Sequence, residues 1–263
     1  MTDMNLVFIL KKIILNIVNM VLSLFDYKVI KKFRYFEINL ENFKKKNQKL
    51  TTENYINFIL ENKNMSKSQI FQDLFVDFIL KKKTNGFYCE VGAADGINLS
   101  NTFFLEKERR WKGILCEPSL FWKERLLANR NENILIFDAI SDKNEIVTFY
   151  EKENNFLSGL KKGLNYSNIY DVKTISLNSV FSNFKIIELD YLSIDTEGNE
   201  LAVLNGLDLD KFRPKIITIE HNYVNEKQIF KRLSKYNYEL VFPYLSRFDS
   251  FYVCKEVLKK NYL

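Results

Sequence analysis

The sequence predicts an α/β fold with a mostly parallel sheet, an antiparallel hairpin at its C-terminal end and a helical extension at its N-terminus. From residue 86 onward, short apolar segments of strand character alternate with helical segments, which is typical of layered α/β proteins. The last two strands, 239–242 and 251–254, are joined by a short loop and should therefore pair antiparallel. Apolar residues make up 46% of the 263 residues, enough to fill a closed core.

The first strand, 86–91, ends in a turn of small residues, Gly92-Ala93-Ala94-Asp95-Gly96. Small side chains let a ligand approach the backbone closely. Ala94 stands where a dinucleotide fingerprint needs glycine, and Glu90 and Asp95 place negative charge on both sides of the turn. A phosphate group would be repelled there, whereas a cationic nucleoside such as S-adenosylmethionine would not. The alternative is an ordinary strand-to-helix turn.

The second strand, 113–116, follows a helix that we expect over 101–109 and ends in Glu117 and Pro118. Glu117 comes 25 residues after Gly92, close to the roughly 20 expected for an acidic residue that binds the ribose hydroxyls of a nucleoside. We therefore expect Glu117 to lie beside the first turn. The alternative is that it caps the helix beginning near Phe121.

A third strand, 134–138, follows a helix over 121–129 and ends at Asp138, where a carboxylate can accept the adenine amino group. Alternatively, Asp138 binds a backbone amide in the turn that follows it. After a further strand, 145–150, the segment 154–168 has loop chemistry and is long enough to cover a substrate.

The fourth and fifth core strands, 191–195 and 216–220, carry the strongest catalytic candidates. Asp195 and Glu197 follow the fourth strand, and Glu220 and His221, the chain's single histidine, end the fifth. Parallel strands end at one edge of a sheet, so these groups should converge beside the first turn. For the role of a general base, our order is Asp195, then Glu220, then His221.

Each of these residues also has a structural interpretation. Asp195 and Glu197 would cap the helix expected over 200–204, Glu220 would pair with a lysine, and His221 would be a satisfied loop residue. A third reading is that Asp195, Glu197 and Glu220 hold a divalent cation through their oxygens, although such sites have no strict spacing signature.

At this point the chain resembles the FkbM-type methyltransferases. The matching segments occur in family order between residues 68 and 222: Ser68-Gln69-Ile70-Phe71-Gln72-Asp73, Glu90 to Gly96, Ser100-Asn101-Thr102, Trp111-Lys112-Gly113, Glu117-Pro118, Asp195-Thr196-Glu197-Gly198 with Glu200, and Glu220-His221. Each segment is weak by itself, but their joint order is specific.

The resemblance implies a Rossmann-like methyltransferase sheet and an S-adenosylmethionine-dependent O-methyltransferase. Its acceptor would be a hydroxyl of a sugar, nucleotide-sugar or glycan. The cofactor-binding residues would be Glu90, Gly92, Ala93, Ala94, Asp95, Gly96, Asn101, Glu117, Pro118, Asp138 and Ala139. Two other classes stay open: a nicotinamide-dependent oxidoreductase on a similar sheet, and a non-catalytic membrane-associated module.

The N-terminal extension, 1–67, carries the whole net charge. It holds 12 Lys or Arg against 6 Asp or Glu, whereas the methyltransferase domain expected over 68–263 holds 27 of each. A nucleic-acid partner is therefore not expected for the domain. Polar residues of segment 5–26 fall within an arc of roughly 140°, which predicts an amphipathic helix.

That helix would lie on a membrane surface or pack against the domain or a second copy of the chain, because Lys11 and Lys12 interrupt it as a spanning segment. Cys89, Cys116 and Cys254 fall in expected strands and read as buried thiols, without zinc or disulfide spacing. We accordingly expect a cytoplasmic protein. The amphipathic helix suggests the alternative that the protein also contacts the inner face of the membrane.

Overall fold

The computed structural model describes residues 49–152, 155–160 and 166–262. Its elements, in chain order, are α3 (Lys49–Asn62), α4 (Gln72–Ile79), β1 (Phe87–Val91), α5 (Phe103–Arg109), β2 (Lys112–Cys116), α6 (Leu120–Arg130), β3 (Ile134–Ile136), β4 (Ala139–Ile140), β5 (Ile146–Lys152), the 3₁₀ turn η2 (Asn155–Leu157), β6 (Tyr166–Ile175), α7 (Leu177–Asn183), β7 (Tyr191–Ile194), α8 (Glu200–Asn205), β8 (Ile216–Glu220), α9 (Glu226–Lys235), β9 (Tyr238–Val241), β10 (Asp249–Cys254) and α10 (Lys255–Tyr262).

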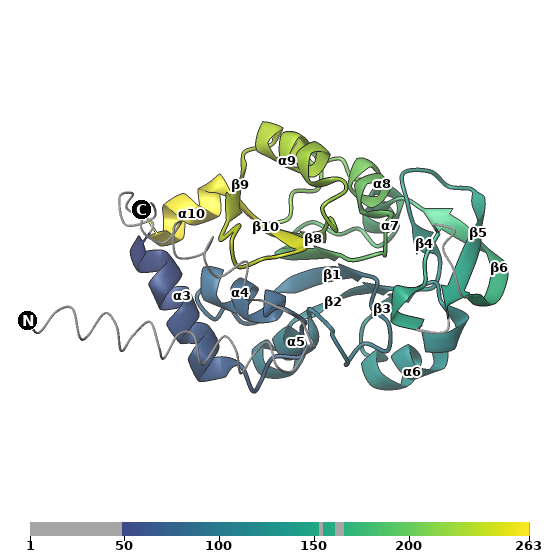
Figure 1. Cartoon of the computed structure of the whole chain (residues 1–263), viewed down its shortest axis with the longest axis horizontal. Coiled ribbons are helices and arrows are strands. Elements are labelled where there is room, and N and C mark those ends of the chain that lie inside the picture. The colour runs from purple at the N-terminus through teal and green to yellow at the C-terminus, as the bar shows by residue number, and fades with distance from the viewer. Residues whose placement is uncertain (1–48, 153–154, 161–165, 263) are drawn as a thin grey trace, which may run out of the picture. The chain divides into compact units, whose positions relative to one another are not determined.

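The central sheet has seven strands in the order β3-β2-β1-β7-β8-β10-β9. Strands β3, β2, β1, β7 and β8 pair in parallel, and β10 pairs antiparallel with both β8 and β9 (Figure 1). The predicted parallel sheet with a C-terminal antiparallel hairpin is confirmed. The chain order reverses between β1 and β7, and ligands of such sheets bind at that point, beyond the carboxyl ends of the strands.

Helices cover both faces of this sheet, because the side chains of each strand point alternately to one face and the other and are apolar on both. Cys89 and Val91 of β1 face a core shared with α7, α8 and α9. Tyr88, which precedes Cys89, faces the other core, shared with α3, α4, α5, α6 and α10. Because successive strand side chains point to opposite faces, buried strands need apolar residues at nearly every position.

Most strands lie within two residues of the ranges predicted from sequence, but the region after β5 differs. The expected loop 154–168 gives way at Tyr166 to β6, which pairs antiparallel with β5 and parallel with β4 in a second, three-stranded sheet. Side chains of β6 are mostly exposed or half-buried. This ribbon therefore buries little apolar surface and has no strong hydrophobic signature in the sequence.

The compact unit that contains the sheet comprises Asn54–Leu263. It begins before the boundary expected at 67/68, because α3 contributes Tyr55, whose ring stacks on Phe242 with centroids 4.7 Å apart. The predicted amphipathic helix over 5–26 lies outside the described residues. Among the residues that are described, no helix is long and apolar enough to cross a membrane.

The three cysteines are buried, free thiols in β1, β2 and β10, as predicted.

A buried ion-pair cluster joins β1 and β7 at their amino ends, the edge opposite the expected site. Asp190 accepts hydrogen bonds from Lys83 Nζ at 2.6 Å, Lys215 Nζ at 2.7 Å and the amide of Phe87 at 3.0 Å. Burial by itself would raise the pKa of the Asp190 carboxyl, but these hydrogen bonds outweigh it and hold the pKa below its ordinary value of 3.8.

We expect Asp190→Asn to lower the free energy of unfolding at pH 7 by about 2 to 3 kcal/mol, because it weakens charge-assisted hydrogen bonds of a buried group. A lowered pKa stabilises the fold above the unfolded-state value, so this contribution should disappear as pH falls below about 4. Urea unfolding across pH measures both effects. Glu188→Gln, whose side chain is 76% exposed, is the control and should change stability by less than about 1 kcal/mol. Equal destabilisation by Asp190→Asn at pH 3 and pH 7 would contradict the assignment.

Candidate functional site

A single row of residues crosses the sheet at the carboxyl edge. Extending the β1–β2, β1–β7 and β7–β8 registers by one residue, and adding the observed β8–β10 pair, gives the row Glu117, Gly92, Asp195, Glu220, Asp249. Side chains directly opposite one another on neighbouring strands share a face. The row therefore places Glu117 on one side of Gly92 and three carboxylates on the other, all on the α4 face of the sheet.

Gly92 makes this row possible. Its φ is +89°, and a Cβ at this position would overlap the backbone oxygen of Asp195. Only glycine lets the chain leave β1 so close to the end of β7. Ala94, two residues further on, also has positive φ, at 46°, which agrees with the tight small-residue turn predicted from sequence.

Glu117 lies beside the first turn, as expected from its spacing. Its carboxylate accepts hydrogen bonds from the amides of Ala94 at 2.9 Å and Ser119 at 2.8 Å. It thus joins the end of β1 to the start of α6, and burial raises its pKa to about 7. Each carboxylate oxygen has a second acceptor site, so two positions remain for a ligand hydroxyl pair.

Glu90 and Asp95, the other acids of the turn, are occupied by the protein itself. Glu90 is buried and accepts hydrogen bonds from Ser100 Oγ and the amide of Asn101 at 3.0 and 2.6 Å. Asp95 accepts hydrogen bonds from the amides of Ile97 and Asn98. Both carboxylates therefore hold the loop in shape, and any effect on a cofactor would pass through the loop.

Asn101 has one amide atom engaged and one free. Its Nδ2 donates to Ser193 Oγ at 2.9 Å, while its buried Oδ1 has no hydrogen-bond partner. Ser193 precedes Asp195 by two residues and shares its face of the sheet. Asn101 thus presents an unused acceptor on the face that carries the row.

Three carboxylates gather where β7 and β8 end. One oxygen each of Asp195, Glu197 and Glu220 lies within 4.8 Å of the other two. Burial and the charge of Glu220 raise the pKa of Asp195 well above its usual range. Burial and the charge of Glu197 raise the pKa of Glu220 to about 8, and burial and Glu200 raise that of Glu197 to about 7.

The capping interpretation of Asp195 and Glu197 is not realised among the described residues. Instead, Glu200 organises the turn before α8: its Oε1 accepts hydrogen bonds from the amides of Thr196 at 3.1 Å and Gly198 at 2.6 Å. Glu197 itself sits at φ +55°, a conformation that non-glycine residues rarely adopt and that is often found at functional sites. The turn therefore leaves Asp195 and Glu197 available to a ligand.

His221 is held by backbone on both ring nitrogens. Its Nε2 donates to the carbonyl of Asp249 at 3.0 Å, and its Nδ1 accepts from the amide of Tyr223 at 3.0 Å. The residue is 4% exposed. The structure thus favours the satisfied-residue interpretation, because His221 would have to break a buried hydrogen bond to act as a base.

Sequence reasoning missed Asp249, which completes the row. Gln72 of α4 donates to its Oδ2 at 2.7 Å, while its buried Oδ1 has no partner. Because β10 runs antiparallel, its first residue lies at the edge where the other strands end. The predicted hairpin and the Gln72 motif residue were the signals that could have located it.

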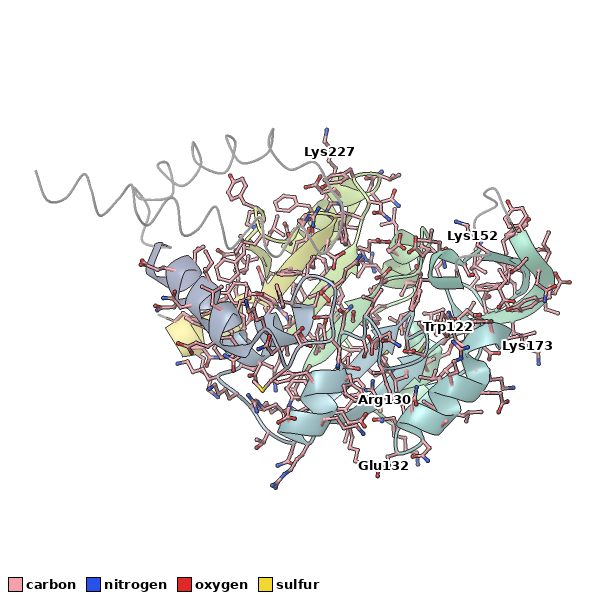
Figure 2. All side chains as sticks on the ribbon, turned by 60° about the horizontal axis from the view of Figure 1, so that its bottom comes forward. Trp122, Arg130, Glu132, Lys152, Lys173 and Lys227 are labelled. Carbon is pink, nitrogen blue, oxygen red and sulfur yellow. The ribbon has the colours of Figure 1, made fainter. Side chains whose placement is uncertain are left out.

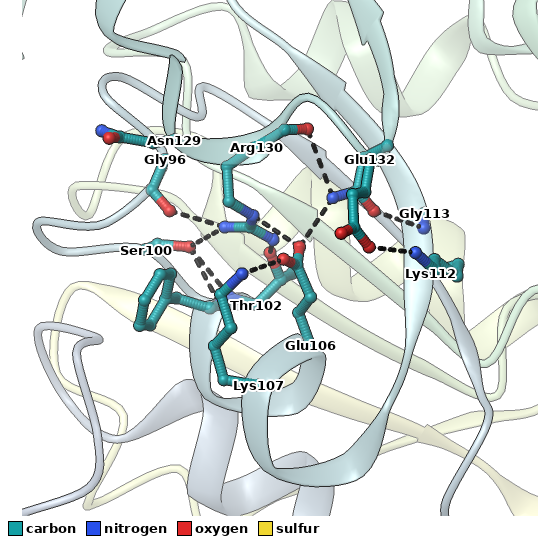
Figure 3. A network of polar contacts seen from close by, with 12 residues as sticks. Gly96, Ser100, Thr102, Glu106, Lys107, Lys112, Gly113, Asn129, Arg130 and Glu132 are labelled. Atoms are coloured by element: carbon teal, nitrogen blue, oxygen red, sulfur yellow. Dashed lines mark hydrogen bonds and ion pairs between the residues drawn. The ribbon is translucent and has the colours of Figure 1, made fainter. Parts of the chain in front are cut away.

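A buried arginine, also missed from the sequence, fixes the loop after β1 (Figure 3). Arg130, the last residue of α6, donates to Glu106 Oε2 and to the carbonyl of Gly96, each at 2.6 Å, and to Ser100 Oγ at 3.3 Å. A Cβ at Gly96 would overlap the Arg130 side chain. The loop that carries the predicted cofactor residues is therefore tied to α5 and α6 at once.

The remaining predicted residues lie beyond β2 and β3. Pro118 follows Glu117 and is half-buried, Asp138 is half-buried between β3 and β4, and Ala139 is 3% exposed in β4. Among the described residues, none forms a hydrogen bond with the Asp138 side chain. Its predicted contact with an adenine amino group stays a prediction.

The β5–β6 sheet reaches the site from the side of α6. Glu151 of β5 accepts a hydrogen bond from Ser119 Oγ at 2.6 Å. The ring of Trp122 lies 4.7 Å from that of Phe156 in η2 (Figure 2 labels Trp122). A Cβ at Gly159 would come within 3.1 Å of the carbonyl oxygen of Thr196. Part of the segment predicted to cover a substrate thus packs directly on the turn that carries Glu197.

Residues 90–240, more than half of the chain, match the family described as the methyltransferase FkbM domain. The chain belongs to this family. The match begins at Glu90 and contains Glu117, Asp195 and Glu220, whereas Gln72 and Asp249 lie outside it. No curated protein matches the chain.

Several solved structures are similar to this chain at low identity. Methyltransferase FkbM from Methylobacillus flagellatus is 10% identical, with a TM-score of 0.42 over 74% of this chain and 59% of that one. Precorrin-6y C5,15-methyltransferase from Geobacter metallireducens is 8% identical, with a TM-score of 0.38 over 64% and 71%. The fibrillarin pre-rRNA processing protein of Methanococcus jannaschii is 15% identical, with a TM-score of 0.35 over 65% and 66%. This chain thus spans less than two thirds of the first of these structures.

Proposed function

We infer that the protein is an S-adenosylmethionine-dependent O-methyltransferase whose acceptor is a hydroxyl of a sugar, nucleotide-sugar or glycan. The observation that carries this inference is the row Glu117, Gly92, Asp195, Glu220, Asp249. It places one hydrogen-bond acceptor, Glu117, on the β2 side of Gly92 and the acidic residues on the β7 side. Membership of the FkbM methyltransferase family supports the same conclusion.

The residues of this edge fit S-adenosylmethionine. Glu117 retains acceptor capacity for two ribose hydroxyls, and the buried Oδ1 of Asn101 is an acceptor without a partner. Glu117 and Asp195 stand two strands apart, or about 10 Å at the usual strand spacing. An elongated cationic nucleoside can span that distance. When bound, S-adenosylmethionine supplies a methyl group on a positively charged sulfur, which needs no further activation.

The chain's own task is to orient the acceptor hydroxyl and remove its proton. Asp195 is our first candidate for the base, because it lies directly opposite Gly92 in the row. Glu220, next in the row, is the second candidate. Several carboxylate acceptors close together also suit a polyol, which offers several hydroxyl donors at once.

We expect Glu117→Gln to weaken S-adenosylmethionine binding tenfold or more, because it replaces charge-assisted hydrogen bonds to the ribose with neutral ones. Isothermal titration calorimetry on the full chain measures this. Glu124→Gln, an exposed residue of α6, is the matched control and should bind like the wild type. Absence of any heat with folded wild-type protein would refute the proposed function, and equal affinity in Glu117→Gln would refute the assigned role of this residue.

The acceptor class is tested by turnover. Candidate sugars, nucleotide-sugars and glycans are incubated with the protein and a deuterated methyl donor, and products are read by mass spectrometry. Incorporation of one labelled methyl group at a hydroxyl is expected. Transfer only to nitrogen, sulfur or carbon atoms in a broad acceptor panel would contradict the O-methylation part of the proposal.

A further inference from the structure

We propose that Asp195, Glu197 and Glu220 bind a divalent cation of the oxygen-preferring kind, Mg²⁺, Mn²⁺ or Ca²⁺, with Asp249 beside it. The proposal rests on the proposed function and deepens it, since the cation would hold the acceptor hydroxyl against the base. Nothing in the family match or in the similar structures assigns such a site.

The geometry of the three carboxylates suits a single ion. Their nearest oxygens lie within 4.8 Å of one another. Oxygens bound to one such cation, at 2.0 to 2.6 Å from it, lie no farther apart than about 5 Å. Such a cation has six or more coordination positions, so three protein ligands leave the remaining positions for water and for the acceptor hydroxyl. The Gly198 and Glu200 turn fixes Glu197, and the β7–β8 register fixes the other two.

A second observation points to a ligand at the same place. Glu220 is 7% exposed and its Oε2 has no hydrogen-bond partner, and Asp249, directly opposite it on β10, is 5% exposed with an unpartnered Oδ1. An unpaired buried carboxylate oxygen costs free energy unless a cation or donor contacts it. Both atoms are acceptors, and both residues point to the face that carries the cluster.

The protein supplies little positive charge to these groups. No ion pair joins Asp195, Glu197, Glu220 or Asp249 to a lysine or arginine in the described part of the chain. Gln72 fixes the Asp249 carboxylate with a neutral amide. A bound divalent cation would supply the positive charge that these closely spaced carboxylates lack.

The cation would also contribute to the reaction. A hydroxyl in contact with a divalent cation loses its proton more readily. Each carboxylate needs to give one oxygen to the cation, so the second oxygen of Asp195 can take that proton. The acceptor oxygen then forms its bond to the methyl carbon while the carbon–sulfur bond breaks, and the electron pair of that bond stays on sulfur.

The proposal is tested with Mn²⁺ and the full chain in 0.15 M NaCl after treatment with a chelator. Loss of the free Mn²⁺ signal in electron paramagnetic resonance measures binding without turnover. We expect saturation below about 1 mM, a thermal shift to higher temperature, and competition by Mg²⁺ or Ca²⁺. Glu220→Gln and Asp249→Asn should each weaken binding tenfold or more. Glu108→Gln, an exposed residue of α5, should bind like the wild type.

The outcomes separate this proposal from the proposed function. A folded wild type that leaves all Mn²⁺ free at 10 mM overturns the cation site, and so does Glu220→Gln binding as tightly as Glu108→Gln. S-adenosylmethionine binding is measured independently by calorimetry in chelator. If that binding and methyl transfer persist unchanged without any divalent cation, the cation proposal fails and the methyltransferase proposal stands.

Discussion

Asp195→Asn should lower kcat for methyl transfer by about 10² to 10⁴-fold, the range for loss of a positioned general base. Asn has the same shape, but one acceptor oxygen is replaced by an amide donor and the side chain cannot take a proton. Because Asp195 lies across from Gly92 and not beside Glu117, affinity for S-adenosylmethionine should change by no more than a few-fold. Single-turnover mass spectrometry measures kcat, and calorimetry measures the affinity.

Asp210→Asn is the control for this substitution, since Asp210 is exposed and outside the row. It should keep kcat within about twofold. If Asp195→Asn retains kcat within threefold of the wild type while its fold is intact, Asp195 is not the base. Glu220→Gln then becomes the decisive variant, because Glu220 is the next carboxylate in the row.

Arg130→Met should lower the free energy of unfolding by about 3 to 5 kcal/mol, the usual result of breaking a buried ion pair from one side. Arg130 is 1% exposed, and its guanidinium donates to Glu106, Gly96 and Ser100 (Figure 3). It also donates to the hydroxyl of Tyr88. Met has a similar length and fills the space, so the loss isolates the polar contacts.

The partner acid shows why this pair is costly to break. Burial alone would raise the pKa of Glu106, but hydrogen bonds from Lys107, Arg130 and Asn133 outweigh it and lower the pKa to about 2. Without Arg130, Glu106 keeps its charge with fewer partners. Urea unfolding of Arg130→Met and of Arg125→Met, an exposed arginine of the same helix, provides the comparison. Arg125→Met should lower the free energy of unfolding by less than about 1 kcal/mol. If Arg130→Met lowers it by no more than that control does, the network around Arg130 does not stabilise the fold as proposed.

The parts of the site that could be predicted lie at the ends of parallel strands. Glu117 and Asp195 each directly follow a run of buried apolar residues, and such runs mark strands in a sequence. Parallel strands end at one edge, so local pattern and a general rule suffice to bring the two residues together. The C-terminal hairpin was predictable for a similar reason, since a short connection forces antiparallel pairing.

The roles of individual polar groups could not be predicted in this way. Glu90 and Glu117 look alike in the sequence, each an acid near the end of an apolar strand. The structure gives Glu90 hydrogen bonds from Ser100, Asn101 and Thr102. It gives Glu117 two backbone amides and leaves the rest of its capacity unused. Which acid is satisfied by the protein depends on where a loop turns, and that is decided by contacts such as Arg130 to Gly96.

The sequence by itself determined the α/β layering, the strand ends and the presence of acids at one edge, because these depend on periodicity and composition along the chain. Tertiary structure alone decided that Asp249, held by Gln72 from 177 positions away, joins Glu220, and that His221 is satisfied by backbone. The physical reason is that hydrogen-bond satisfaction is a property of neighbours in space, and those neighbours come from segments with no local relation in the sequence.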